Sequence, residues 1–218
     1  YIYSKIVENL RTNKALSDEL SYRIILLHQS QAQALQAQIN PHFLNNVLER
    51  INWTAVSQIG EGNSISDSIH SLSILLESSL DTSNYLVPVS EEVHHGNVYA
   101  YIVSGSYGGE TDLAWNINSQ IMHYYIPKFT LQPIIENAFH YGISEKAEGG
   151  RIVVKGDFYN NGIMFSIQDD GMGIEEETLL KLRESLNEKD IFARKHIGMR
   201  NVNQRIRLLF GDEYGLTI

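Results

Sequence analysis

The sequence predicts an α+β chain in which a helical hairpin precedes an α/β sandwich domain. Three observations support this fold class. Apolar residues recur every three or four positions over roughly the first 80 residues, which is the spacing of a narrow helical stripe. Beyond residue 110, apolar and polar residues alternate as they do in half-buried strands. Helical patterns return between those mostly antiparallel strands, which indicates one sheet covered by helices.

The composition is that of an ordinary soluble globular protein, and it removes several functional classes. The 218 residues suffice for one large domain or two small ones. The net charge of -9 argues against a nucleic-acid partner, which needs a basic face. The absence of cysteine excludes disulfides, thiolate catalysis and cysteine-based zinc sites. No apolar run approaches the ~20 residues of a transmembrane helix, and neither an initial Met nor a signal peptide is present. We therefore expect a cytoplasmic piece of a longer protein, without membrane contact of its own.

The first 58 residues predict one long helix or two joined helices. Their apolar stripe consists of Ile2, Ile6, Leu10, Leu16, Leu20, Ile24, Leu27, Leu35 and Ile39. A narrow stripe of this kind cannot bury itself and needs a partner helix. A turn signal at 59–63 ends the pattern.

A second amphipathic helix follows this turn, with Ser64 or Ser66 as its expected N-cap. Its apolar face consists of Ile65, Ile69, Leu72, Leu75, Leu76 and Leu80. Two antiparallel helices with a short connection form a helical hairpin. Two such hairpins pair naturally into a dimeric four-helix bundle.

The second domain is expected to begin near residue 87, where Val87-Pro88 breaks the helical pattern. Ser90, followed by Glu91 and Glu92, predicts a helix start with acids in the first turn, and this helix would run to about residue 104. The expected strands are centred on 113–117, 151–159 and 162–168, and the expected helices lie at 128–141, 175–187 and 198–210. Asn160-Asn161-Gly162 predicts a hairpin between the last two strands.

A histidine directly after a proline, inside a long helical pattern, is the first candidate for chemistry. Proline in a helix interior costs about 3 kcal/mol, so the step Pro41-His42 gives up stability to present one imidazole. Neutral imidazole is nucleophilic near pH 7. The competing interpretation is a solvated histidine beside a kink.

The segment 131–140 is the second candidate, because Asn137 and His140 lie one turn apart if the segment is helical. An Asn carboxamide oxygen is a hard ligand that suits Mg²⁺. The alternative is that Asn137 is simply exposed.

Two glycine-containing turns are the remaining candidates. Asp169 precedes Gly171 and Gly173, which allow close backbone approach to a ligand, while the carboxylate can accept a hydrogen bond from an exocyclic amine. Gly198 opens a helix whose free N–H groups favour an anion. Each of these segments is also compatible with a plain turn or an ordinary helix start. The charged segment 175–195 is compatible with either a nucleotide lid or a surface loop.

In this order and spacing, the last three segments resemble the nucleotide-binding boxes of the ATPase domain shared by gyrase, Hsp90 chaperones, MutL and histidine kinases. With the Pro-His step upstream, the chain is similar to LytS-type sensor histidine kinases, a class that includes the YesM-like proteins. The resemblance covers about residue 30 to the end. It is strongest in ALQAQINPHFL, IPKFTLQPIIENA, DDGMGI, IGMRNV and LLFGDEYGL.

The resemblance implies a role for individual residues. His42 would be the phosphoacceptor that attacks the ATP γ-phosphoryl group, and Glu136 would orient its imidazole. Asn137 would hold Mg²⁺ against the phosphates, and Asp169 would bind the adenine amine. The full set implied for nucleotide binding is Asn137, His140, Asp169, Gly171, Gly173, Gly198, Arg200 and Asn201.

The resemblance also implies an organisation and partners. Residues 1–29 would be a signalling helix, 30–87 the dimerisation and phosphotransfer hairpin, and 88–218 the ATP-binding domain, with a C-terminal strand apparently truncated. The partners would be a second copy of the chain and the receiver domain of a response regulator. The whole protein would be a bacterial membrane sensor anchored N-terminal to residue 1.

Two other functions are weighed against the kinase. A degenerate sensor would bind nucleotide or a partner without phosphotransfer. Asn45 and His196 favour it, because they depart from the family pattern. A chaperone- or topoisomerase-like ATPase is disfavoured by Pro133, which occupies the position of the glutamate that activates water in hydrolysing relatives and cannot act as a base.

Overall fold

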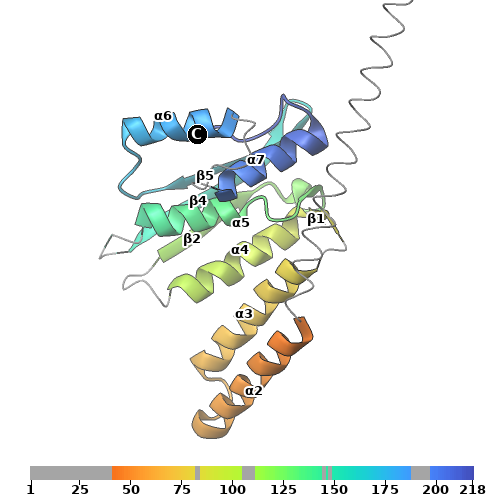
Figure 1. Cartoon of the computed structure of the whole chain (residues 1–218), viewed down its shortest axis with the longest axis vertical. Helices are drawn as coiled ribbons and strands as arrows, with labels where there is room; N and C mark the ends of the chain where they lie inside the picture. Colours follow the sequence, from red (N-terminus) through yellow and green to blue (C-terminus); the bar gives the residue numbers. More distant parts are fainter. Residues whose placement is uncertain (1–40, 82–83, 105–110, 144–145, 147–148, 188–196) are drawn as a thin grey trace, which may run out of the picture. The chain divides into compact units, whose positions relative to one another are not determined.

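The structure of the chain is a computed structural model that describes residues 41–81, 84–104, 111–143, 146, 149–187 and 197–218 (Figure 1). The chain divides into two compact units, residues 1–47 and 48–218. The described elements lie in the second unit, apart from the first residues of α2. The expected helix before residue 41 lies outside the described residues.

Two helices open the described part, α2 (Pro41–Ile59) and α3 (Ser64–Leu80). The predicted end of the first helix at 59–63 is confirmed, and Gly60 has a φ of +98° there. The predicted serine cap of α3 is wrong. Asn63 is the N-cap, and its side-chain oxygen accepts the N–H of Ser66 at 2.9 Å, because the cap must lie one residue before the first helical position.

A short two-stranded sheet, β1 (Leu86–Pro88) paired antiparallel with β3 (Tyr125–Pro127), was not expected, because three residues show no alternation. Helix α4 (Val89–Ser104) follows β1 directly. It begins one residue before the predicted Ser90. The N–H groups of Val89 and Ser90 donate to the carbonyls of Tyr124 and Met122 at 2.9 and 3.0 Å, so backbone groups satisfy the start of this helix.

The main sheet has the order β2-β4-β5, with β2 (Thr111–Ile117), β4 (Gly150–Tyr159) and β5 (Gly162–Asp169). β4 and β5 are antiparallel and joined by a two-residue turn in which Asn160 has a φ of +50°, which confirms the predicted hairpin. β2 runs parallel to β4, so the sheet is mixed. A 3-10 turn, η1 (Ser119–Ile121), follows β2.

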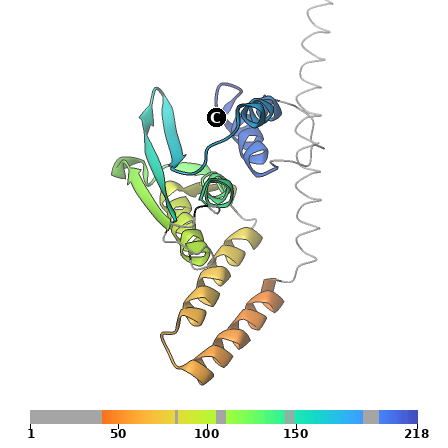
Figure 2. The same ribbon diagram turned by 90° about the vertical axis from the view of Figure 1, so that its left-hand side faces the viewer.

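α4, α5 (Gln132–Asn137) and its continuation η2 (Ala138–Ile143) lie against one face of this sheet (Figure 2). α7 (Ile197–Phe210) packs against α5, and α6 (Glu176–Asn187) packs against α7. The core forms where Ile152 and Val154 of β4 meet Ile135 of α5 and Phe139 of η2, all of them buried. The mixed α+β class is therefore confirmed, while the dimeric bundle stays a prediction. No helix within the described ranges is long and apolar enough to cross a membrane.

Candidate functional site

The continuous helical segment α5–η2 brings the downstream candidate segments together. Its first half lies beside the start of α7, where a Cβ added to Gly198 would lie 3.6 Å from the Pro133 Cβ. Its last residues lie against the turn after β5, where the N–H of Met172 donates to the carbonyl of Gly142 at 3.3 Å. The three segments predicted to form one site therefore line one helical axis.

The turn after β5 fits against η2 only because both contact positions are glycine. A Cβ on Gly171 would lie 2.2 Å from the Gly142 carbonyl oxygen, and a Cβ on Gly142 would lie 2.6 Å from Oδ1 of Asp169. Oδ1 of Asp169 accepts the Gly171 N–H at 2.9 Å. A carboxylate has further acceptor capacity beyond this bond. Asp169 is half-buried, so it can offer that capacity to an amine at the turn.

The side chain of Asn137 is oriented by its own helix. Its Nδ2 donates to the carbonyl of Pro133 at 2.6 Å. Because a carbonyl can only accept, the nitrogen of the carboxamide must face it, and the oxygen is left as an acceptor. A half-buried carboxamide oxygen is a ligand that Mg²⁺ prefers, so the residue fits the metal predicted there.

The first turn of α7 has exposed residues beside the buried side chain of Arg200. Gly198 and Asn201 are exposed, whereas Arg200 is only 3% exposed. The Nε and Nη1 atoms of Arg200 have no hydrogen-bond partner in the part of the chain that is described. A buried cation without a partner is costly, so an anion at this helix start would relieve that cost.

The prediction of an ordinary helix through residue 141 is wrong from Ala138 onward. The chain there is a π-helix, η2, whose wider turns change the spacing between Asn137 and His140. His140 is exposed, and its ring lies 4.7 Å from the ring of Tyr141. π-helical turns are frequent at functional sites, and this one ends at the Gly142 contact. At the far side of that contact, Gly173 has a φ of +74°.

The residues proposed for phosphotransfer are only partly described. Pro41 and His42 open α2, but their side chains lie outside the described residues. Glu136 is half-buried, and its Oε1 accepts a hydrogen bond from Nε2 of Gln132 at 2.9 Å. Whether Glu136 orients the imidazole therefore stays a prediction.

The expected lid is divided. Residues 188–196, with His196, lie outside the described part, but the preceding residues form α6. Leu182 and Leu186 of α6 are buried, and the Nδ2 of Asn203 donates to the Leu186 carbonyl at 2.7 Å. This half of the segment is thus packed against α7.

Sequence reasoning missed one buried carboxylate. Glu92 reads as an ordinary first-turn acid, yet it is fully buried. Burial raises the pKa of this carboxyl, and its hydrogen bonds to backbone N–H groups oppose that rise. No local pattern marks it, because its partners lie about 40 residues further along the chain.

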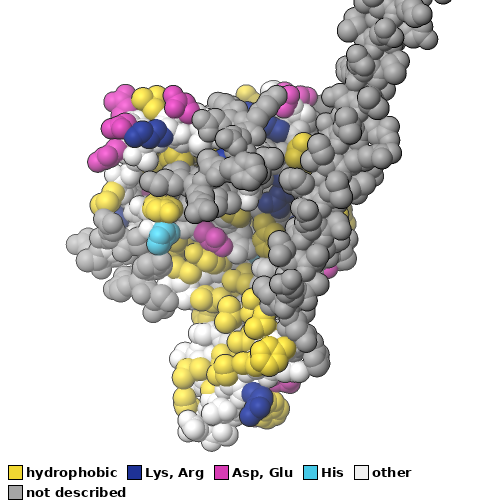
Figure 3. Space-filling model, in the orientation of Figure 1, with side chains coloured by type: hydrophobic (Ala, Val, Ile, Leu, Met, Phe, Trp, Pro, Cys, Tyr) yellow, Lys and Arg dark blue, Asp and Glu magenta, His cyan; other side chains and the backbone are white. Residues whose placement is uncertain are grey.

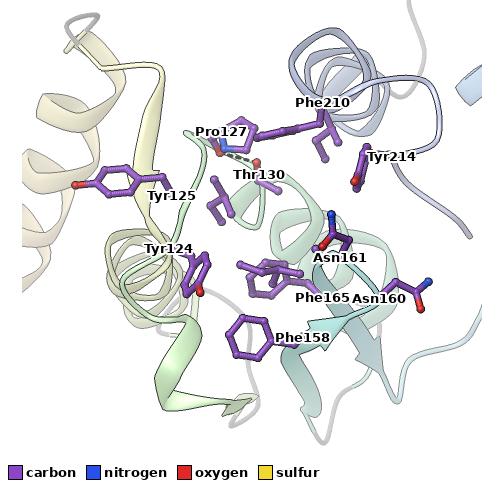
Figure 4. A pocket seen from close by; sticks show the side chains of 14 residues that line it. Tyr124, Tyr125, Pro127, Thr130, Phe158, Asn160, Asn161, Phe165, Phe210 and Tyr214 are labelled. Atoms are coloured by element: carbon purple, nitrogen blue, oxygen red, sulfur yellow. Dashed lines mark hydrogen bonds between the residues drawn. The ribbon is translucent and has the colours of Figure 1, made fainter.

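A cavity of about 520 Å³ with aromatic walls lies away from the predicted nucleotide-binding residues (Figure 4). Its aromatic walls are Tyr124, Tyr125, Phe158, Phe165, Phe210 and Tyr214. None of the predicted nucleotide-binding residues lines it, and none of the described residues that line it is charged. Its apolar lining does not suit a polyphosphate. In the described residues, no three His, Asp or Glu side chains gather as a metal site.

Comparison with known proteins defines the class. Residues 30–111 match the family model of histidine kinases. The chain is 31% identical to the sensor histidine kinase YesM of Bacillus subtilis, over 95% of this chain and 34% of that protein. It is 29% identical to the sensor protein LytS of the same organism, over 88% of this chain and 32% of that protein.

These matches identify the chain as a relative of the LytS/YesM-type sensor histidine kinases. It spans about a third of the length of these curated relatives. Among solved structures, it resembles the histidine kinase domain of a blue-light activated kinase from Erythrobacter litoralis EL346, at 16% identity and a TM-score of 0.40, over 82% of this chain and 84% of that one.

Proposed function

We propose that the chain is the cytoplasmic catalytic region of a sensor histidine kinase in a two-component system. It would transfer the γ-phosphoryl group of ATP to His42 and then to an aspartate of a response regulator. One observation carries the proposal: the Asp169–Gly171 turn and the start of α7 both contact the α5–η2 segment, at its two ends. Along this segment lie a carboxylate that can accept a hydrogen bond from an amine, a carboxamide oxygen that can bind Mg²⁺, and a helix start that favours an anion.

The nucleotide would lie along this axis. Asp169 accepts a hydrogen bond from the adenine amine, at a turn that Gly171 and Gly173 keep free of side chains. The polyphosphate meets the first turn of α7, where Gly198 and Asn201 are exposed and the guanidinium of Arg200 lacks a partner among the described residues. His140, which is exposed on the connecting η2, would contact the same ligand.

Mg²⁺ would be held by the Asn137 oxygen and by phosphate oxygens. When bound, the ion neutralises negative charge on the phosphates during transfer. Pro133 lies one turn before Asn137 and has no side chain that can activate water. The site therefore favours transfer to an acceptor side chain over hydrolysis.

The acceptor would be His42. A neutral imidazole nitrogen attacks the γ-phosphorus, a P–N bond forms, the bond to the bridging oxygen breaks, and ADP leaves. Glu136 would accept the other ring N–H and orient the imidazole. The phosphoryl group then passes to a receiver aspartate, which regenerates the free histidine.

The second copy would complete the helical part. Apolar side chains gather over α2 and α3 (Figure 3), and Ile51, Trp53, Ile65 and Leu72 are exposed. No residue of α3 is fully buried. Packing against the same faces of a second chain would bury this surface and form the four-helix bundle. We also propose that the whole protein is a sensor anchored in the bacterial cell membrane.

The test is incubation of the chain with γ-labelled ATP and Mg²⁺. The expected product is an acid-labile, alkali-stable label on the protein. His42→Gln should abolish the label, while the control His70→Gln, on an exposed residue of α3, should retain it. A label that persists in His42→Gln contradicts the acceptor assignment. Nucleotide binding without any label would favour the degenerate sensor.

A further inference from the structure

The loop between β3 and α5 is strained and lacks a cap of its own. Phe129 has a φ of +59°, which is costly for a residue with a bulky side chain. Leu131 occupies the N-cap position of α5 and makes no side-chain capping bond. The first N–H groups of a helix have no partner within it, so this start needs an acceptor from elsewhere.

Glu92 of α4 supplies that acceptor. Its Oε1 accepts the N–H of Phe129 at 2.6 Å, and its Oε2 accepts the N–H groups of Thr130 and Leu131 at 2.9 and 2.8 Å. One carboxylate thus holds three consecutive amides, including that of the strained residue. Because the side chain is fully buried, water cannot replace it.

The same loop is held from α7. Nη1 of Arg205 donates to the carbonyl of Lys128. Burial lowers the pKa of the Arg205 guanidinium, and the charge of Glu92 opposes that effect. α5 carries Asn137, and α7 carries Gly198 and Arg200, so one junction sets the position of both helices.

We propose that Glu92 is a positioning residue for the Mg²⁺ end of the nucleotide site, because its carboxylate fixes the start of α5, the helix that carries Asn137. It acts through α5 and does not touch the nucleotide. The proposal rests on the proposed function of the site. The Asp169 turn lies at the opposite end of α5–η2, where the Gly142 contact secures it. Loss of Glu92 should therefore disturb the Asn137 end more than the adenine end.

The experiment compares ATP affinity with and without Mg²⁺ in wild type and in Glu92→Gln. The Gln side chain retains one acceptor oxygen and turns an amide N–H₂ toward backbone donors. We expect the gain in ATP affinity that Mg²⁺ provides to fall about tenfold or more, with Mg²⁺-free affinity nearly kept. Amide hydrogen exchange at 129–131 should accelerate. Glu91→Gln, one position earlier and half-buried, is the matched control and should change neither quantity.

Two outcomes overturn the proposal. One is an unchanged Mg²⁺-dependent gain in Glu92→Gln, and the other is an equal loss with and without Mg²⁺, which would indicate a general structural role. If Glu92→Gln does not fold, Glu92→Asp replaces it. That variant keeps the charge on a shorter side chain and should show a smaller loss of the same kind. Absence of ATP binding by the wild type would instead contradict the proposed function and remove the positioning role with it.

Discussion

At the scale of single residues, buried ionisable groups separate structural positions from site positions. Glu92 is buried with three donors, whereas Arg200 is buried with two nitrogens that lack partners in the described part of the chain. The first arrangement is complete within the protein. We propose that an anion completes the second. Sequence patterns cannot separate the two cases, because both residues stand in the first turn of a helix.

His95 gives a prediction at this scale. It is 4% exposed, and burial lowers its pKa below the ordinary 6.5, while Glu91 opposes this effect and His94 and Lys128 add to it. The unfolded chain therefore binds more protons than the folded chain between the lowered pKa and 6.5. The free energy of unfolding should fall as the pH drops through this window.

Urea unfolding between pH 5 and pH 8 measures this slope. His95→Gln should remove part of it, and His70→Gln, on an exposed residue of α3, should preserve it. The same slope in wild type and His95→Gln would show that His95 does not contribute to the pH dependence.

At the scale of elements, α3 gives a prediction about its cap. Asn63→Ala removes the acceptor for the Ser66 N–H and should lower the free energy of unfolding by about 1 kcal/mol. Ser64→Ala, which alters the neighbouring exposed residue, should change it by less than about 0.5 kcal/mol. Urea denaturation followed by far-UV circular dichroism measures both. A larger loss in Ser64→Ala would point to the serine cap expected from the sequence.

Elements with a strong period could be predicted from the sequence, and elements set by distant partners could not. The β4–β5 hairpin followed from its Asn-Gly step and its alternation. The pair β1–β3 was missed because its strands are too short to alternate. The π-helical η2 was missed because its apolar residues also fit an ordinary helix. Among the candidate residues, Asn137 and Gly171 were predicted from their motifs, whereas Glu92 could not be, because it bonds backbone groups of another element.

At the scale of the whole molecule, the prediction concerns dimerisation. Ile65→Glu and Leu72→Glu place a charge on exposed apolar positions two turns apart on α3. If the helices pair as proposed, each substitution should raise the dissociation constant of the dimer at least about tenfold, because a buried unpaired charge is costly. Analytical ultracentrifugation measures this constant. His70→Glu, on an exposed polar position of α3, should leave the dimer intact. A monomeric wild type at tens of micromolar would contradict the bundle.

Lys128 connects the end of α3 with α7. Its Nζ lies 3.1 Å from the carbonyl oxygen and 3.3 Å from Oδ2 of Asp81, directly after α3, while its own carbonyl accepts from Arg205 of α7. One lysine therefore connects the residue that follows α3 directly to α7, without any strand of the main sheet between them. In this chain, the residue directly after α3 and a side chain from the second half of α7 are held by one and the same lysine.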